Sequence, residues 1–369
     1  MYAGSERGFY LSTDAGNNWQ SFQLNLPIVP VTDLMIRDND LVAATAGRAF
    51  WILDDLGAIQ QAGTASAVTL FSPKPAYKFG GGTGLPEAKY KAGQNAPEGV
   101  ILDYILPEVT DSTTVTLKIT DARGNLIRTY SNKKDSSYVK YPGGPAAATL
   151  LSAKKGHNRF LWNLRNETIQ PDVKDVFVYG SYEGYAVPPG NYKAQLNFNG
   201  TISETEMTVL PNPAISATAA DWNEQQQVLA SITAAISEMH QQVNELRKIR
   251  KQLIHHSDIL KDVKPAEKVL DEAKKLIEGI DAWESNIVEG RIQNGQDVIN
   301  WPSKLNVEFF NIKRLADAAD PRITQGIKAR LADLQSQWNA EKVKVEAIKK
   351  SVDAYNTLYK SQQLEALIF

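Results

Sequence analysis

The sequence predicts a multidomain β plus α protein, with strands in its N-terminal part and an antiparallel helical bundle at its C-terminal end. Three observations lead to this fold class. Short segments of alternating polar and apolar residues, separated by turn residues, recur up to residue 210. From residue 222 onward the apolar residues recur at intervals of three and four, which is the helical period. Between two strand-rich regions, residues 61–98 are rich in Gly, Pro, Ala and Ser.

Composition excludes several classes of function. The 369 residues carry a formal net charge of −2, so no global field attracts nucleic acid or anionic lipid. Cysteine is absent, which excludes disulfides, zinc–thiolate sites and cysteine nucleophiles. Hydrophobic residues make up 43% of the chain and charged residues 22%, as in an ordinary globular protein of two or three domains.

Residues 1–60 contain short strands separated by polar turns, which indicates an antiparallel meander. The predicted strands are 8–12, 19–22, 31–36, 41–45 and 49–53. The next segment, 61–98, is expected to be a linker or a long surface loop. Its Gly-rich part, residues 80–84, lacks the Gly-Lys-Ser/Thr ending of a phosphate-binding loop, and no helical pattern follows it.

Residues 99–210 return to the period of two that is typical of strands. About seven strands are predicted here, which is the strand count of an immunoglobulin-like β-sandwich. A turn at Asp121–Asn125 joins two of them, with Gly124 or Asn125 suited to a positive φ. Many aromatic residues fall in this range, and most are expected in the core; a carbohydrate-binding platform is the alternative.

Residues 215–369 change to the helical period and predict an antiparallel bundle. Asp221 is expected to cap the first helix, and Asp320-Pro321 to start the last long one. The apolar stripes are Val228, Leu229, Ile232, Ala235, Ile236, Met239, Val243 and Leu246; Val269, Leu270, Ala273, Leu276 and Ile277; and Ile327, Leu331, Leu334, Trp338, Val343 and Ile348.

One motif in the N-terminal region has a clear physical role. Ser12, Asp14, Gly16 and Trp19 fit the Asp-box pattern of Ser, any residue, Asp, any residue, Gly, two residues, Trp. The Asp carboxylate accepts hydrogen bonds from backbone amides of a tight turn, the Gly adopts a conformation closed to other residues, and the Trp covers the turn. We therefore expect a structural role and not a catalytic one for Asp14.

Together with this motif, several segments support a resemblance to a known family. The chain resembles the C-terminal part of bacterial BNR-repeat/VPS10 (sortilin-like) β-propeller proteins, which are often labelled glycosyl hydrolases. The resemblance implies final propeller blades in residues 1–60, an FlgD-type Ig-like domain in residues 99–210 and a helical tail. The segments that carry it are Tyr2–Tyr10, Leu24–Pro27, Val31–Leu34, Ala44–Asp55, Thr120–Thr129, Gly156–Arg165 and Val187–Tyr192.

The strand count of residues 1–60 predicts partial blades. A propeller blade has four antiparallel strands, whereas residues 1–23 and 31–55 each supply about three. The first seven residues also lack the basic start and apolar core of an export signal. We therefore expect that the sequence is truncated inside a blade; the alternative is a small independent sheet packed on the sandwich.

Candidate catalytic and ligand residues favour structural interpretations. Asp54 and Asp55 could in principle be the carboxylate pair of a glycoside hydrolase. Adjacent residues on a strand point to opposite faces, however, so the two cannot flank one glycosidic bond, and we expect them in a turn or cap. Arg48 alone does not form the arginine triad of a sialidase-type site. None of the four histidines, His157, His240, His255 and His256, has metal-ligand spacing, so we expect them to be solvated or capping residues. The basic cluster Arg247, Lys248, Arg250 and Lys251 is expected to be a solvated face balanced by Asp258, Asp262 and Glu267.

These observations predict a non-catalytic binding or scaffold region of an exported propeller protein. No cofactor or metal is expected, and the expected partner is a protein or carbohydrate ligand, with no nucleic acid and no transmembrane segment. The alternative function is the accessory C-terminal part of a glycoside hydrolase-like enzyme whose active site lies on N-terminal blades outside this sequence. Extracellular or periplasmic localisation follows from the resemblance alone.

Overall fold

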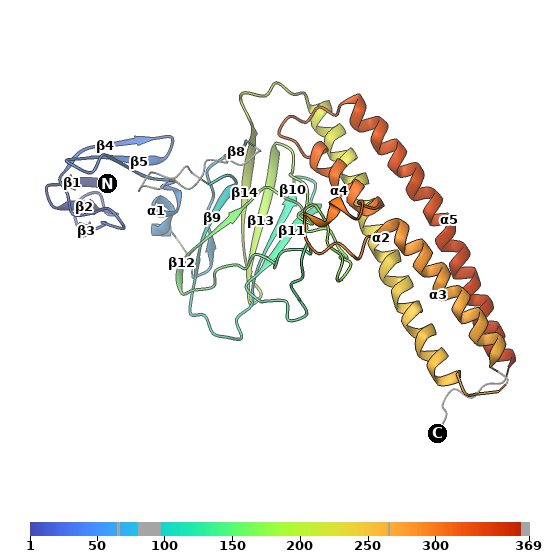
Figure 1. Cartoon of the computed structure of the whole chain (residues 1–369). Coiled ribbons are helices and arrows are strands. Elements are labelled where there is room, and N and C mark those ends of the chain that lie inside the picture. The colour runs from blue at the N-terminus through green and yellow to red at the C-terminus, as the bar shows by residue number, and fades with distance from the viewer. Residues whose placement is uncertain (65–66, 80–96, 265, 363–369) are drawn as a thin grey trace. The chain divides into compact units, whose positions relative to one another are not determined.

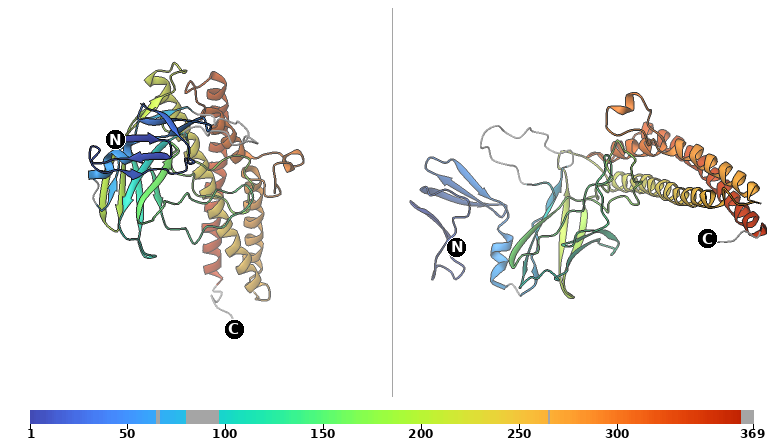
Figure 2. Two further views of the ribbon diagram at one scale, coloured as in Figure 1. Left: turned by 90° about the vertical axis from the view of Figure 1, so that its left-hand side faces the viewer. Right: turned by 60° about the horizontal axis from the view of Figure 1, so that its bottom comes forward.

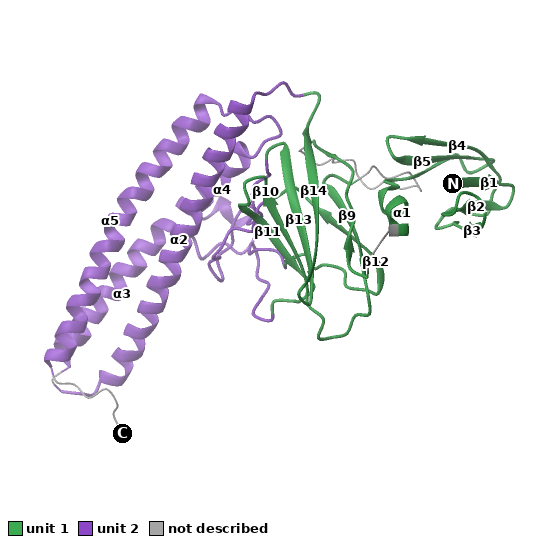
Figure 3. Cartoon of the chain, turned by 180° about the vertical axis from the view of Figure 1, so that it is seen from behind, with its two compact units in different colours: residues 1–135, 148–165, 188–214 green, residues 136–147, 166–187, 215–369 purple. Residues whose placement is uncertain are grey.

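The computed structural model describes residues 1–64, 67–79, 97–264 and 266–362. An N-terminal β region holds several small antiparallel sheets and a mixed sheet, and a bundle of long helices follows it (Figure 1). The chain divides into two compact units, coloured separately in Figure 3. Unit 1 comprises residues 1–135, 148–165 and 188–214, and unit 2 comprises residues 136–147, 166–187 and 215–369.

The first small sheet of unit 1 has three antiparallel strands; the second and third overlap the predicted strands 8–12 and 19–22, and the first precedes them. They are β1 (Tyr2–Ser5), β2 (Gly8–Leu11) and β3 (Gln20–Ser21), paired in that order. Phe9 of β2 is buried and stacks on Tyr2 with ring centroids 6.0 Å apart. One face of this sheet is therefore apolar and covered.

The second small sheet is also a three-stranded antiparallel meander. Its strands are β4 (Val31–Arg37), β5 (Asp40–Thr45) and β6 (Phe50–Leu53). Asp38 and Asn39 form the turn between β4 and β5, and both have positive φ (50° and 64°), as a two-residue hairpin of type I′ requires.

The segment after β6 differs from the predicted linker of residues 61–98. Its described part forms a short helix, α1 (Gly57–Gln61), a turn of 3-10 helix (Ala62–Thr64) and two strands, β7 (Thr69–Leu70) and β8 (Ala76–Lys78). These strands pair with β9 (Val100–Leu106) and β14 (Thr201–Pro211). Five residues of the predicted linker, Thr69–Leu70 and Ala76–Lys78, are therefore in strands. Main-chain pairing with distant strands leaves no local signal in segments this short. The predicted Gly-rich loop 80–84 lies outside the described residues.

Two further sheets complete unit 1. A five-stranded mixed sheet has the order β11-β10-β13-β14-β8, and a three-stranded antiparallel sheet has the order β12-β9-β7. Six of these eight strands come from residues 99–210. The bounds not yet given are β10 (Val115–Asp121), β11 (Leu126–Ser131), β12 (Gly156–Trp162) and β13 (Gly190–Phe198).

Aromatic side chains from the two sheets meet in a common core. Tyr130 of β11 contacts Phe160 of β12 with ring centroids 4.6 Å apart, and Trp162 of β12 meets Tyr192 of β13 at 5.3 Å. All four side chains are at most 5% exposed. The expectation that most aromatic residues of this region lie in a core is confirmed for these four.

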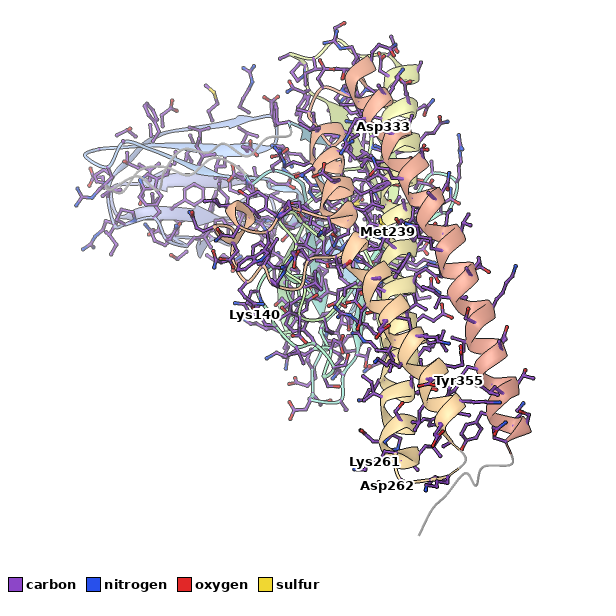
Figure 4. All side chains as sticks on the ribbon, turned by 45° about the vertical axis from the view of Figure 1, so that its right-hand side comes forward. Lys140, Met239, Lys261, Asp262, Asp333 and Tyr355 are labelled. Atoms are coloured by element: carbon purple, nitrogen blue, oxygen red, sulfur yellow. The ribbon has the colours of Figure 1, made fainter. Side chains whose placement is uncertain are left out.

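Unit 2 is built on four helices, of which α2, α3 and α5 run side by side (Figures 1 and 2). They are α2 (Ala219–Leu260), α3 (Glu267–Ile287), α4 (Leu305–Ala316) and α5 (Gln325–Ser361). Met239 of α2 and Tyr355 of α5 are both buried in this bundle, at different levels along it (Figure 4). No helix within the described ranges is long and apolar enough to span a membrane.

The helix starts differ from prediction by a few residues. Thr218, and not Asp221, is the N-cap of α2; Asp221 is the third helical residue and completes a capping box with the Thr218 hydroxyl and backbone N–H. The last helix does not start at Asp320-Pro321. It starts at Gln325, because the Thr324 hydroxyl accepts from the backbone N–H of Ile327 and so supplies the cap.

The predicted apolar stripes are largely confirmed. On α2, Leu229, Ile232, Ile236, Met239 and the next two stripe residues are 0% exposed. On α5 the stripe is wrong at one position: Val343 is 71% exposed, whereas Val345 is buried at 2%. Leu331, Leu334 and Trp338 of the same helix are buried as predicted.

Candidate functional site

The turn between β2 and β3 is closed by side chains of the predicted Asp box. The Ser12 hydroxyl donates to Asp14 Oδ1 (2.8 Å) and accepts from the backbone N–H of Gly16 (2.8 Å). Asp14 also accepts from Asn18, whose backbone N–H binds Oδ1 (2.8 Å) and whose side-chain amide binds Oδ2 (2.6 Å). Both carboxylate oxygens are therefore engaged inside the loop.

The backbone and electrostatics of this turn agree with a structural role. Ala15 and Gly16 have φ of 61° and 93°, and a Cβ on Gly16 would lie 3.8 Å from the ring of Trp19, which therefore lies close over the turn. Hydrogen bonds from Asn18, followed by the bond from Ser12, lower the pKa of Asp14 to about 2. At neutral pH this carboxylate is an ionised anchor for the loop.

The outer face of the second small sheet is apolar and exposed. The strand register places Met35, Val42 and Ile52 side by side in one row and Ala44 and Phe50 in the next. Phe50 is 76% exposed, Ile52 62% and Met35 59%. Isolated exposed apolar residues are normal, but neighbours on one sheet face indicate a contact surface.

The inner face of the same sheet is covered at its centre, although Ile36, opposite Leu41, is 53% exposed. Leu41 packs with Phe9 of β2 and with Leu56 in a buried cluster, so the two small sheets share a core. A cavity of about 60 Å³ remains between them, with Phe22 and Trp51 among its lining residues. Both faces of the second sheet therefore carry apolar side chains, and burial is confined to the inner face, at Leu41 and Ala43.

Asp55 occupies a structural position, as the turn-or-cap interpretation predicts. It has φ of 55° and is 7% exposed, and its Oδ1 accepts from the backbone N–H of Gly57 (2.9 Å) and from Asn39 Nδ2 (3.1 Å). Its own N–H binds Asp40 Oδ1 at 2.8 Å. Arg48, the other candidate from this region, is exposed and donates to the Gly47 carbonyl next to it.

A cluster that sequence reasoning missed lies on the β9–β12 pair. Asp103, 4% exposed, accepts two parallel hydrogen bonds from Arg159 (Nε and Nη2, each 2.9 Å) and one from His157 Nε2 (2.9 Å). This geometry is a bidentate arginine–carboxylate pair. The sequence contains two signs of this cluster. Asp103 interrupts an apolar strand at its centre. His157 and Arg159 are two residues apart, so they lie on one face of the partner strand.

A second cluster, in unit 2, corrects the expectation that the histidines are solvated or capping residues, because His240 is buried. His240 of α2 is 0% exposed and donates from Nδ1 to the carbonyl of Pro171 (3.0 Å), and its ring contacts those of Tyr182 and Phe310. Burial lowers the pKa of His240 to about 4, a shift that the Pro171 hydrogen bond opposes. Burial also raises the pKa of Tyr182. These groups are buried within packed side chains, which fits a structural core.

The remaining histidines and the basic cluster lie on α2. His256 stacks on Tyr359 with ring centroids 5.5 Å apart. Arg247 pairs with Glu284 and Arg250 with Glu284 and Asp281, all across to α3. Arg247 and Arg250 thus pair with residues of α3 other than the expected Asp258, Asp262 and Glu267, because the order of the sequence does not show which helices lie next to each other.

The described side chains hold no group of three or more His, Cys, Asp or Glu residues placed for a metal ion. The carboxylates of Asp14, Asp55 and Asp103 all bind neighbouring groups of the fold. Comparisons with family models, with curated proteins and with solved structures gave no match for this chain.

Proposed function

We propose that this chain is a non-catalytic binding and scaffold region of an exported, propeller-type protein. In this proposal β1–β3 and β4–β6 are partial propeller blades, and the sheets of β7–β14 form an Ig-like sandwich. The observation that carries the proposal is the closed Asp-box turn between two strands of a meander that stacks on a second meander. This is the way in which the family that the sequence resembles builds successive blades.

Two features support binding over catalysis. The carboxylates of Asp14, Asp55 and Asp103 accept hydrogen bonds from their own loops and strands, so they serve as anchors for the fold. The most exposed apolar side chains of the second sheet, Phe50 and Ile52, are neighbours on one face. Exposed apolar faces of this kind bind other protein surfaces.

The proposal is tested with the purified full chain. Fluorogenic glycosides and internally quenched peptides are offered as substrates, with Asp14→Asn and Asp103→Asn variants run in parallel. We expect no turnover above the buffer blank from any of the three proteins. Hydrolysis that co-elutes with the chain at constant specific activity would overturn the proposal, and the variants would show which carboxylate is needed.

Binding is measured with the same protein on glycan and peptide arrays. Saturable retention without turnover is the expected result. The absence of saturable retention on both arrays would contradict the binding part of the proposal, whatever the outcome of the hydrolysis assay.

A further inference from the structure

The loop of residues 138–146 in unit 2 closes on itself. The Tyr138 hydroxyl donates to the carbonyl of Pro145 (3.1 Å), seven residues further along the chain. Between these two residues, the N–H of Gly144 donates to the Tyr141 carbonyl (3.1 Å) and forms a tight turn. A loop whose ends meet in this way is compact and holds its side chains in a fixed arrangement.

A second set of hydrogen bonds fixes this loop to a neighbouring segment of the same unit. The Tyr141 hydroxyl donates to Asp172 Oδ2 (2.8 Å) and to the carbonyl of Val173 (3.0 Å). The N–H of Val178 donates to the Gly143 carbonyl (3.4 Å). Both tyrosine rings of the loop are thus held by their own hydroxyls, so a ligand that binds against them has little side-chain motion to restrict.

This loop lines an open pocket of about 570 Å³, which is within the size range of small-molecule sites. Two tyrosines and two prolines give it aromatic and apolar walls. Lys140 is exposed (Figure 4), and among the described residues that line the pocket it is the only charged one. Its ammonium has no ion-pair partner among the described side chains.

An aromatic wall with one basic group suits a ligand that has an apolar face and a negative charge. The face of an aromatic ring carries partial negative charge, so it attracts the C–H bonds on the flat face of a sugar ring. A carboxylate on the sugar would then pair with Lys140. Because the pocket is open to solvent, one sugar unit of a longer chain can enter it while the neighbouring units stay in water.

We propose that this pocket binds a sugar unit that carries a carboxylate, such as a hexuronate, with its ring face on Tyr138 and its carboxylate at Lys140. The inference rests on the proposed function, since it names the ligand class of that binding region and the place where it binds. A proline-rich peptide also docks between aromatic rings, but it brings no negative group for Lys140. The acidic sugar is therefore favoured over the peptide.

The test is calorimetric titration of the full chain with trigalacturonate and with its methyl ester, which has the same skeleton but no charge. We expect trigalacturonate to bind more tightly by roughly three- to fivefold, as one exposed ion pair allows. Lys140→Gln should remove this difference by weakening only the binding of the acid. Lys134→Gln, which changes an exposed lysine outside the pocket, should leave both affinities unchanged.

The aromatic wall is tested at Tyr138. Tyr138→Phe keeps the ring and should still bind both saccharides. Tyr138→Ala removes the ring and should weaken the binding of both saccharides by roughly five- to tenfold. Its circular dichroism spectrum is compared with that of the natural chain, and Lys140→Gln tests the same pocket without changing a side chain that holds the loop together.

Equal affinities of the natural chain for the acid and the ester would overturn the selection of an acidic sugar. Binding that survives both Tyr138→Ala and Lys140→Gln would overturn the pocket as its site. Binding of a proline-rich peptide, with no heat from either saccharide, would overturn the ligand class. Retention on the arrays through any other surface would leave the proposed function standing after each of these results, so the two failures are distinguishable.

Discussion

The buried His240 makes the stability of the helical unit depend on pH. Its Nδ1 must donate, because the Pro171 carbonyl can only accept, so the neutral ring keeps a bare Nε2. This nitrogen is buried and has no hydrogen-bond partner among the described residues. Protonation at Nε2 would place a charge beside the rings of Tyr182 and Phe310. We therefore predict that acid destabilises unit 2 through this residue.

The magnitude follows from the pKa of His240, which burial lowers from 6.5 to about 4. Between these values the unfolded chain binds a proton that the folded chain does not. The stabilisation is thus complete above pH 6.5 and is lost as the pH falls toward 4, by about 1.4 kcal/mol per pH unit. The full loss is about 3 kcal/mol, a large part of the stability of an ordinary domain.

The assay is urea unfolding followed by circular dichroism at helical wavelengths, since the long helices all lie in unit 2. Free energies of unfolding are measured at pH values from about 8 to about 4 for the natural chain and for His240→Asn. The Asn side-chain nitrogen takes the place of Nδ1 and keeps the bond to Pro171, but it does not titrate. The variant is expected to be less stable at all pH values because it fills less space.

The diagnostic quantity is the slope against pH and not the stability at one pH. Other carboxylates titrate in both proteins, so their contribution cancels in the difference between the two curves. We expect the natural chain to lose about 2 kcal/mol or more beyond the loss of the variant across this window. Parallel curves for the two proteins would refute the assignment of the acid sensitivity to His240.

Three further changes test the local structure. Ser12→Ala removes one donor and one acceptor from the Asp-box turn and should cost about 1–2 kcal/mol, measured as faster hydrogen exchange in the β2–β3 hairpin. Gly143→Ala should destabilise unit 2 by about 2 kcal/mol or more, measured as a lower Tm, because φ is 69° and the new Cβ would lie 2.6 Å from the Val178 nitrogen. Lys313→Met removes the ammonium that donates to two loop carbonyls and should cost about 2 kcal/mol in urea unfolding.

The helical stripes could be predicted because a long helix repeats its signal over many turns. On α2 the predicted residues from Leu229 to Leu246 are buried, although Val228 is only partly so. A single misplaced residue such as Val343 does not disturb the period, because Val345 takes the buried position two residues later. Five of the six strands of residues 1–60 could also be predicted, because alternation and turn residues agree there; the exception is β1.

Pairing between distant segments could not be predicted in this way. β7 has two residues and β8 has three, which is too short for a period, and their partners lie far along the chain. The Asp103 cluster was missed for a related reason: a carboxylate in an apolar strand indicates a buried partner, but the partner strand with Arg159 follows more than fifty residues later. Only the register of the sheet brings them together.

Hydrogen bonds to its backbone explain why the loop of residues 166–187 belongs to unit 2. Residues 166–187 contain no strand or helix, so their buried carbonyls need donors from elsewhere. Side chains of the helices supply them: His240 binds Pro171, Asn244 binds Asp172, Arg247 binds Lys174, Gln226 binds Ala186, and Lys313 binds Ser181 and Glu183.

Three of these donors follow the helical period. His240, Asn244 and Arg247 are spaced by four and three residues, so they form a polar stripe along one face of α2 next to its apolar stripe. A sequence pattern based on apolar residues alone assigns that face of α2 to solvent. In the structure the face binds the backbone of a loop that precedes the helix in sequence. Polar residues at helical spacing, among them a histidine, are therefore the signal that a helix binds irregular backbone, and they explain why the loop belongs to the helical unit.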